Sequence, residues 1–473
     1  MLLTRQVAVL PARWIALCRR LPRCGRLCAL AGWATATLAS TIALTATAAA
    51  SAATPAATPA AKAARGSVVA IGGALQDNNV EVWSRLVALA GGKSGRWLVI
   101  PTASGDPTKS GEAAIALLKR QGATAEMIPL STKLGSAADL AALVKDPAWL
   151  KKLGTARGVY FTGGDQARIT DALLTSDGQA TPMLDAIRAL LQRGGVVAGS
   201  SAGAAIMSST MFRDPRDMLS MMIDGAAANT DIGSGLGFVA NGVFVDQHFV
   251  KRGRIGRMLA VMAQERIGVG VGVEENSAAI FRGDDIEVIG ARGVVVADLR
   301  SATAMARPLR VKGAHVYWLE SGDKMNLQTG EVTPSPAKAK AKKLDHTAKD
   351  FQPYFRRVRF MPDMLGDGVF VNAMTSLVDS PATELRAIAF APGLENRTGF
   401  EFRLHKTSGT LGYFESAGGG ERYSVVKLAL DVEPIRMASP LYSGWGADVG
   451  ARDGAASKAG ENAGSPRLPE NPK

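Results

Sequence analysis

Short apolar segments alternate with amphipathic ones between residues 66 and 200, and this alternation constrains the fold more than any other feature. Ser67–Ile71 (SVVAI) is a continuous apolar run of strand length, and residues 80–90 carry apolar side chains at helical spacing. The pattern continues with strands expected at 97–100, 125–129, 158–161 and 196–198, and helices at 111–121 and 137–145. Apolar strands separated by helices predict an α/β fold with a mostly parallel sheet covered on both faces.

The chain is long enough for more than one domain, because it has 473 residues of which 47% are hydrophobic. This composition excludes disordered and fibrous proteins. Changes in composition along the chain predict six segments. They are a signal peptide (1–50), a disordered linker (51–65), the main α/β domain (66–333), a Lys/Ala/Pro linker or exposed loop (334–350), an accessory β-rich region (351–443) and a disordered tail (444–473).

The first fifty residues have the composition of a long secretory signal. They contain six arginines and no acidic residue, and an apolar Thr/Ala-rich run leads to small residues at Ala48, Ala50 and Ser51 that fit A-x-A-like cleavage sites. We therefore expect a secreted or periplasmic bacterial protein with no stable membrane association after cleavage. A retained membrane anchor is the alternative interpretation.

Cleavage of this segment would change both the thiol content and the charge of the chain. All three cysteines lie in it, so the mature form would have no disulfide, cysteine nucleophile or thiolate metal site. The formal net charge would fall from +13 to +7. We expect this mild excess to solvate the surface, with some attraction for acidic polymers, and we expect no basic block alternating with exposed aromatics and no nucleic acid partner.

A candidate nucleophile follows the strand expected at 196–198. Gly199 and Gly203 flank Ser201 in the spacing G-x-S-x-G, and an Ala-rich segment of helical type follows. Small neighbours let the backbone bend sharply between a strand and a helix, which exposes the hydroxyl to a substrate carbonyl. An ordinary glycine-rich turn is the alternative.

A second turn ends the strand at 158–161. Gly163 and Gly164 allow backbone N–H groups to approach an oxyanion, and Gln166 can offer an amide to a substrate. The next strand along the chain delivers Ser201, which would place the two turns close together. A common strand-to-helix turn would have the same residues.

A candidate base is His248, one of four histidines in the chain. It lies just after the segment at 233–245, which has the pattern of a hairpin, and directly follows Asp246 and Gln247. A serine hydroxyl needs a neighbouring base, and histidine has the right proton affinity near neutral pH. The arginines that follow suit the binding of substrate carboxylates, although a solvated helix face is the alternative. They are Arg252, Arg254 and Arg257.

A carboxylate to orient the imidazole is expected after the strand at 268–273. Glu274 and Glu275 occur there side by side. Adjacent residues of an extended backbone point to opposite faces, so only one of them can reach His248. The spacing does not choose between them.

Four motifs in this order resemble the cyanophycinases and related peptidase E-like enzymes of serine peptidase family S51. They are FTGGDQ (161–166), GSSAGA (199–204), DQHF with its Arg-x-Arg-x-x-Arg (246–257) and GVEENSA (272–278), and the resemblance spans about 66–332. It implies a flavodoxin-like, class I glutamine amidotransferase-like sandwich, often dimeric. It also implies hydrolysis of cyanophycin, a poly-aspartate with arginine on each side-chain carboxyl, to β-Asp-Arg dipeptides.

The resemblance also assigns roles to residues. It implies Ser201 as nucleophile, His248 as base and Glu275 as the acid, with no metal and no cofactor. The expected oxyanion donors are the N–H groups of Ala202 and Gly164. The positions that match the substrate cleft are Gln166, Asp246, Gln247, Arg252, Arg254 and Arg257. A dipeptidase acting on short Asp-containing peptides and a non-catalytic polymer-binding protein are the alternatives.

The sequence does not indicate a function for the region after residue 333. Residues 351–434 alternate apolar and polar residues between turn signals, which predicts the β-rich accessory region. It could bind insoluble polymer, cap the main domain or contribute to a homodimer.

Overall fold

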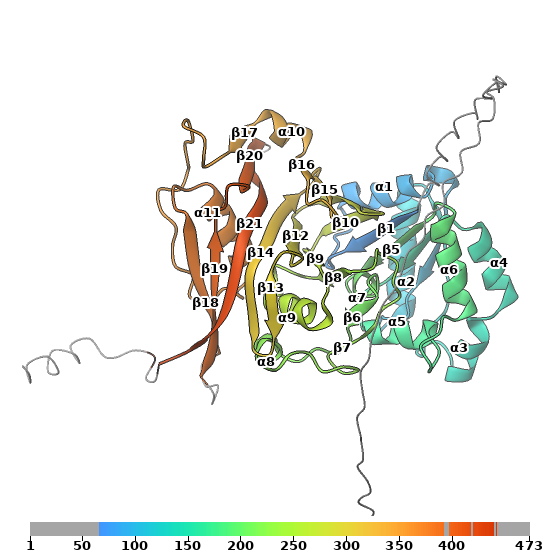
Figure 1. The fold of residues 1–473 in the computed structure, drawn as a ribbon. Coiled ribbons are helices and arrows are strands. Elements are labelled where there is room, and N and C mark those ends of the chain that lie inside the picture. Colours follow the sequence, from blue (N-terminus) through green and yellow to red (C-terminus); the bar gives the residue numbers. More distant parts are fainter. Residues whose placement is uncertain (1–65, 392–396, 418–419, 439–440, 442–473) are drawn as a thin grey trace, which may run out of the picture. The chain divides into compact units, whose positions relative to one another are not determined.

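The structure is a computed structural model that describes residues 66–391, 397–417, 420–438 and 441. The expected signal peptide, the linker at 51–65 and the tail at 444–473 lie outside these residues. Two large sheets and a small two-stranded one make up the β structure of the described chain (Figure 1). No helix in the described part is both long and apolar enough to span a bilayer.

The first sheet is half parallel and half antiparallel. Its parallel half has the order β1-β5-β4-β2-β3, and these strands lie where the apolar runs predict them. Beyond β1 the sheet continues antiparallel through β10, β11, β15 and β16. The expectation of a mostly parallel sheet therefore holds for one half only. The bounds are β1 Ser67–Ile71, β2 Arg96–Ile100, β3 Thr124–Met127, β4 Gly158–Phe161, β5 Val196–Ser200, β10 Ser277–Arg282, β11 Asp285–Gly290, β15 Lys324–Asn326 and β16 Val332–Thr333.

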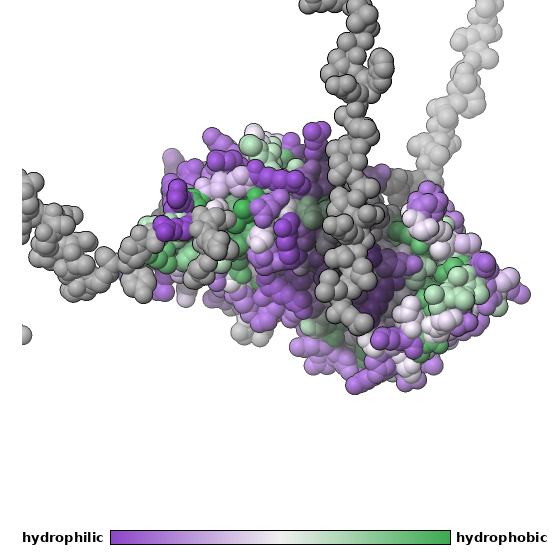
Figure 2. All heavy atoms as spheres, turned by 90° about the horizontal axis from the view of Figure 1, so that it is seen from below, coloured by the Kyte–Doolittle hydropathy of each residue, from purple (hydrophilic) through white to green (hydrophobic). Residues whose placement is uncertain are grey.

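Helices cover both faces of the parallel half, as expected. Alternate strand residues point to opposite faces, so Val69 packs with the helices of one layer and Val68 with those of the other. The first layer is α1 (Val80–Leu89) and α2 (Pro107–Arg120). The second contains α4 (Pro147–Thr155), α5 (Gln166–Leu173) and α6 (Pro182–Gln192), preceded by α3 (Ala137–Leu143). From below, the surface is mostly hydrophilic, with hydrophobic patches toward the side where Figure 1 draws α3 and α4 (Figure 2).

Residue chemistry explains where these helices begin. Asp106, Asp146 and Thr181 each accept a hydrogen bond from a backbone N–H of the first turn. A proline follows each of them at the start of the helix, where its fixed φ fits and its missing N–H costs nothing. The helix starts are thus encoded locally.

The second sheet is almost wholly antiparallel. Its main order is β17-β20-β21-β14-β12-β9-β8, and β8 with β9 is its parallel pair among the described strands. The hairpin expected at 233–245 is wrong: β7 (Ile232–Ser234) pairs with β6 (Thr210–Phe212), whereas β8 (Val243–Gln247) joins β9 (Val269–Val273). Alternating polarity identified the strands but carried no information on their partners. The other strands are β12 Gly293–Asp298, β13 Thr303–Ala306, β14 Leu309–Glu320, β17 Lys342–Leu344, β18 Glu384–Ala389, β19 Thr398–His405, β20 Leu411–Ala417 and β21 Gly420–Arg436.

The second sheet packs on the antiparallel half of the first. Along β12, Val294 and Val296 belong to the core shared with β10 and β11, whereas Val295 and Ala297 face the core that holds α9 (Ile255–Glu265). The helix α8 (Met218–Asp224) contributes to the same outer core. The carboxyl ends of β5, β8 and β9 all lead into the loops described below.

The C-terminal region continues the second sheet. The strand β21 pairs with β14, and the described residues after 62 belong to one compact unit. Residues 334–350, expected to be a linker or exposed loop, contain α10 (Pro336–Lys340) and β17. The side chain of Lys338 is fully buried and its Nζ lies 2.8 Å from Oδ2 of Asp323. A lysine in a polar tract thus serves as an internal ion-pair partner, which composition alone did not indicate.

Candidate active site

Ser201 occupies a strained turn between β5 and α7 (Ala202–Ala205). Its backbone has φ 53° and ψ −111°, a conformation that costs energy for a residue with a side chain, and its N–H donates to the Ile71 carbonyl at 3.0 Å. The flanking glycines are required sterically. A Cβ on Gly199 would lie 2.1 Å from the Gly203 carbonyl oxygen, and one on Gly203 would lie 2.5 Å from the Phe161 oxygen. The G-x-S-x-G spacing therefore forms a tight elbow that presents the hydroxyl.

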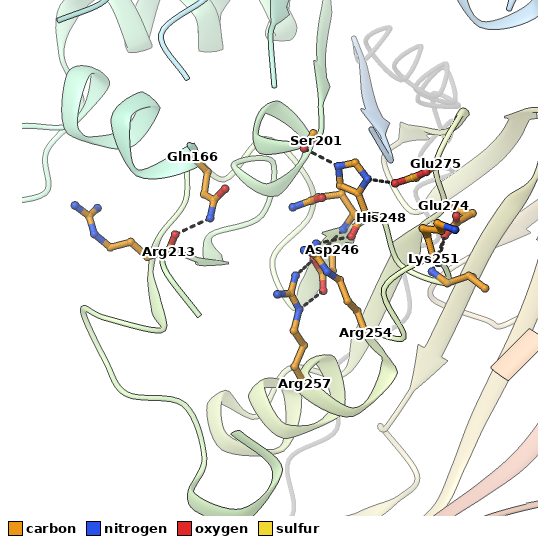
Figure 3. Close-up of polar contacts among 12 residues, drawn as sticks. Gln166, Ser201, Arg213, Asp246, His248, Lys251, Arg254, Arg257, Glu274 and Glu275 are labelled. Atoms are coloured by element: carbon orange, nitrogen blue, oxygen red, sulfur yellow. Dashed lines mark hydrogen bonds and ion pairs between the residues drawn. The ribbon is translucent and has the colours of Figure 1, made fainter. Parts of the chain in front are cut away.

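Three side chains form a continuous hydrogen-bonded chain across the two sheets (Figure 3). Ser201 Oγ lies 2.9 Å from His248 Nε2, and His248 Nδ1 lies 2.6 Å from Glu275 Oε1. Ser201 follows β5 of the first sheet, whereas His248 and Glu275 follow β8 and β9 of the second. With Nδ1–H donated to the carboxylate, the neutral ring presents the lone pair of Nε2 to the serine hydroxyl.

The surroundings of His248 favour its neutral form. The residue is 7% exposed, and this burial lowers its pKa; the hydrogen bond to Glu275 opposes the shift, and the positive charges of Arg252 and Arg254 add to it. Its backbone has φ 48°, and its N–H donates to the Gly72 carbonyl at 2.7 Å. An unprotonated imidazole in a fixed orientation can act as a general base.

The two neighbouring glutamates take different positions. Glu275 reaches His248, whereas the Glu274 carboxylate is buried and its Oε2 accepts the N–H groups of Val250 at 2.6 Å and Lys251 at 2.9 Å. Burial raises the pKa of Glu274. Glu274 thus holds the loop that follows His248. This structural role was not evident from the sequence, although adjacent residues of an extended backbone point to opposite faces.

Gly73 is a second residue whose role the sequence did not reveal. A Cβ added to it would lie 2.3 Å from both Cε1 and Nε2 of His248, so the imidazole packs directly on its backbone. Its φ of 99° also favours glycine. Its carbonyl accepts the Asn276 N–H at 2.9 Å, which ties the loop after β1 to the one that carries Glu275. The signal that could have found it is the Gly72-Gly73 pair at the carboxyl end of a parallel strand.

Of the expected oxyanion donors, Ala202 directly follows Ser201, and Gly164 follows a glycine that packs against Ser201. A Cβ on Gly163 would be 3.2 Å from the Ser201 Cβ, which places the glycine turn after β4 against the nucleophile. Gly164 follows with φ 141° and no room for a side chain, since its Cβ would lie 2.0 Å from the Ala103 oxygen. Ala202 opens α7, so its N–H has no acceptor within the helix.

The three arginines after His248 separate into two kinds. Arg254 and Arg257 are buried, and both contact the buried carboxylate of Asp246. Arg257 makes a two-point contact, with Nε–Oδ2 at 2.8 Å and Nη2–Oδ1 at 2.6 Å. Burial lowers the pKa of Arg254 to about 10. A solvated helix face is therefore excluded for these two, and Arg252 is the exposed member.

The two glutamines also differ. Gln166 donates from Nε2 to the Arg213 carbonyl at 2.6 Å, which directs its amide nitrogen to that backbone (Figure 3). Gln247 is 7% exposed, and its Oε1 has no hydrogen-bond partner among the described residues. The Asp246 carboxylate accepts hydrogen bonds from Arg254 and Arg257, so it stabilises the loop rather than facing a substrate.

Comparisons with known proteins agree on one family. The model of peptidase family S51 matches residues 68–289, a stretch that includes Ser201, His248 and Glu275. The cyanophycinase of Nostoc sp. (strain PCC 7120 / SAG 25.82 / UTEX 2576) is 30% identical over 290 residues, covering 58% of this chain and 90% of its own length. The cyanophycinase of Geminocystis herdmanii (strain PCC 6308) is 29% identical over 279 residues, covering 56% and 95%.

A solved structure is more distantly similar. The peptidase from an acI-B1 Actinobacterium aligns with a TM-score of 0.39 and 21% identity over 55% of this chain and 97% of its own. The family model match ends within β11, so the C-terminal strands lie beyond it.

Proposed function

Because the chain belongs to peptidase family S51 and is a serine peptidase, we propose that it hydrolyses cyanophycin through an acyl-enzyme on Ser201. The observation that carries this proposal is the unbroken contact from Ser201 Oγ through the His248 ring to the Glu275 carboxylate. Such a chain meets the geometric requirement for an activated serine nucleophile. The order Ser, His, Glu along the sequence is immaterial to that geometry.

In the proposed mechanism His248 Nε2 takes the proton of Ser201 as Oγ attacks the scissile carbonyl carbon. The tetrahedral intermediate places its negative oxygen near the N–H groups of Ala202 and Gly164, each worth about 3 kcal/mol if well aimed. The imidazolium then protonates the leaving amine, and the C–N bond breaks to leave an ester on Ser201. A water molecule, deprotonated by the same nitrogen, attacks the ester and releases the acid. Glu275 keeps Nδ1 protonated and stabilises the imidazolium throughout.

The substrate is proposed from the relatives, which are named cyanophycinases, and from the charge beside the site. Arg252 is exposed next to His248 and can attract a carboxylate of the polymer. Arg254 and Arg257 would not contact the substrate. They would hold Asp246 and the loop that carries Gln247 and His248 in place. The products would be β-Asp-Arg dipeptides.

Export, the fold family and the oligomeric state are proposed for the chain as a whole. The composition of residues 1–50 supports export to the periplasm or beyond. The strands β3-β2-β4-β5 have the relative order 2-1-3-4 of a flavodoxin-like core, with β1 added beside β5, which supports that fold for the first half. A homodimer is proposed from the family resemblance.

The deciding experiment is mass spectrometry of the products formed from purified cyanophycin. We expect β-Asp-Arg from the wild type and none from Ser201→Ala. Ser209→Ala, a change at an exposed serine in the same region, is the matched control and should hydrolyse the polymer normally.

Asp-X dipeptides are assayed beside the polymer. Cleavage of the dipeptides alone would replace the proposal with a peptidase E-like dipeptidase. Polymer binding without any hydrolysis, equal in wild type and Ser201→Ala, would identify a non-catalytic binding protein.

A further inference from the structure

An exposed basic segment lies in the C-terminal region, outside the stretch that matches the family model. Residues 354–360, with the sequence YFRRVRF, form what we call the arginine segment. It carries three exposed arginines, Arg356, Arg357 and Arg359, and the nearest acidic residues in sequence are Asp350 and Asp363. The expectation that no basic block alternates with exposed aromatics is therefore wrong, because exposure of this segment is decided by the fold.

These arginines differ from the others in the same region. Arg310 pairs with Glu433 at 2.6 Å, and Arg386 pairs with Glu384 and Glu401. Among the described residues, no hydrogen bond or ion pair satisfies the side chains of the three arginines in the segment. Their charges are thus available to a ligand.

The backbone of the arginine segment is fixed at both ends. At the start, the N–H of Phe355 donates to the Asp379 carbonyl at 2.9 Å, and that of Tyr354 to Asp379 Oδ1 at 2.9 Å. At its end, the Met361 carbonyl accepts the Ile388 N–H at 3.0 Å. Fixed ends reduce the conformational entropy that a partner must overcome on binding.

A cavity of about 390 Å³ is lined by residues of the segment and of the helix α11 (Val369–Val378). The three arginines line it together with Asn372, Thr375 and Ser376 of the helix, and so do three apolar residues, Phe355, Val358 and Met361. No acidic side chain lines it. The cavity therefore combines positive charge with neutral polar groups and apolar surface, and its guanidinium groups suit a carboxylate.

Two aromatic side chains flank the arginines in sequence. Tyr354 is 69% exposed and Phe360 is 57% exposed, high values for large apolar groups. The Tyr354 ring also makes a T-shaped contact with Phe355, and exposed aromatic rings of this kind can stack on a guanidinium.

We propose that the arginine segment is an accessory site that holds a carboxylate-bearing polypeptide, and that this polypeptide is the cyanophycin chain itself. The identity of the polymer depends on the proposed function. Each arginine of cyanophycin is joined through its α-amino group, so it retains a free α-carboxylate and a guanidinium. The carboxylates meet the three arginines and the guanidinium groups stack on Tyr354 and Phe360. Holding the polymer here raises its effective concentration at the catalytic site.

The test uses the full chain carrying Ser201→Ala, so that binding is measured without hydrolysis. Cosedimentation with insoluble cyanophycin compares this protein with Arg356→Gln/Arg357→Gln/Arg359→Gln on the same background. Lys109→Gln/Lys119→Gln/Arg120→Gln removes equal charge from the exposed face of α2 and is the matched control. We expect the arginine-segment variant to bind about tenfold more weakly or worse, since three exposed charge contacts are lost, and the control to bind normally.

A second variant and a second polymer distinguish carboxylate binding by the arginines from guanidinium stacking on the aromatic side chains. Tyr354→Ser/Phe360→Ser should weaken binding to cyanophycin but leave binding to poly-L-aspartate, which has no guanidinium, unchanged. With Ser201 restored, the arginine-segment variant should cleave a short soluble β-Asp-Arg oligomer at the wild-type rate and insoluble polymer more slowly.

Three results would overturn the accessory site. They are normal binding by the arginine-segment variant, an equal loss in the α2 control, and a preference of the segment for DNA or anionic vesicles over carboxylate polymers. Failure of the proposed function has a different signature. In that case the Ser201 protein leaves the polymer uncut, while the Ser201→Ala protein still binds it through the arginine segment.

Discussion

The turn that presents Ser201 and the loops that present His248 and Glu275 are built in different ways. The Ser201 elbow rests on one short motif: Gly199 and Gly203 make the room for the turn, and Ile71 and Phe161 of the neighbouring strands close around it. The base and its carboxylate come from β8 and β9, whose register pairs Gln247 with Val273, and they are fixed by loops of the first sheet. The nucleophile turn is therefore recognisable from one short motif, although neighbouring strands pack around it, whereas the acid–base pair is assembled from two strands and held by loops of the other sheet.

The largest expected effect comes from the carboxylate itself. Glu275→Gln should lower kcat about 10³- to 10⁴-fold, because an amide neither stabilises the imidazolium nor fixes the tautomer. Glu274→Gln makes the same change one residue earlier and retains an oxygen that can accept the Val250 and Lys251 N–H groups. Steady-state kinetics on cyanophycin should show a far smaller loss for this control. Equal losses in both variants would contradict the separate positions of the two glutamates.

The next effect sharpens the dependence of His248 on the first sheet. Gly73→Ala should lower kcat about 100-fold, because the new methyl group would displace the imidazole by the order of an ångström. Gly178→Ala is the control, since Gly178 also has a positive φ but a Cβ there meets nothing within 4 Å. Both should lose some stability, and kinetics with thermal melts would distinguish them. Normal activity of Gly73→Ala would show that the ring is free to move.

A smaller effect concerns the loop after His248. Glu274→Ala leaves the buried N–H of Val250 and the partly buried N–H of Lys251 without their acceptor and should cost about 1 to 3 kcal/mol of unfolding free energy, with a moderate loss of kcat. Urea denaturation measures the first and steady-state kinetics the second. Recovery of both by Glu274→Gln is the expected check. If Glu274→Ala were as stable as the wild type, the two N–H groups would not need the carboxylate as acceptor, and water would satisfy them instead.

The smallest effect is on the pH profile. Burial lowers the pKa of His248, so kcat/KM should remain high to a pH below the ordinary histidine value and then fall as the ring becomes protonated. Arg252 contributes to this lowering, so Arg252→Gln should shift the acidic limb to higher pH. Lys109→Gln, at an exposed position on α2, should not move it. An unchanged limb in Arg252→Gln would contradict this electrostatic coupling.

The same shift has a consequence for stability. A histidine whose folded pKa is below its unfolded value binds a proton more readily in the unfolded chain. The unfolding free energy should therefore decrease as the pH falls through the unfolded histidine pKa and then level off below the folded one. Replacing His248 by glutamine, which does not titrate, should remove that part of the acid sensitivity.

Much of the first sheet could be predicted from sequence because its signals are short-range. β1 and β4 lie at the predicted residues, and the G-x-S-x-G spacing places Ser201 at the end of β5. The motif resemblance also identified the glutamate that the structure brings to His248. Periodicity and turn chemistry act over a few residues, so a single sequence carries them.

Strand partners and burial were decided by the tertiary structure. The alternation at 233–245 showed strands but not that β7 pairs with β6 and β8 with β9. No short-range sequence pattern indicated that Asp246 would form ion pairs with Arg254 and Arg257. Nor did one indicate that Lys338 would be buried against Asp323. These outcomes depend on contacts between residues up to hundreds of positions apart, whose free energies no short segment encodes. The sequence by itself therefore determined the chemical groups and their local turns, and the packing of two sheets decided which of those groups face one another.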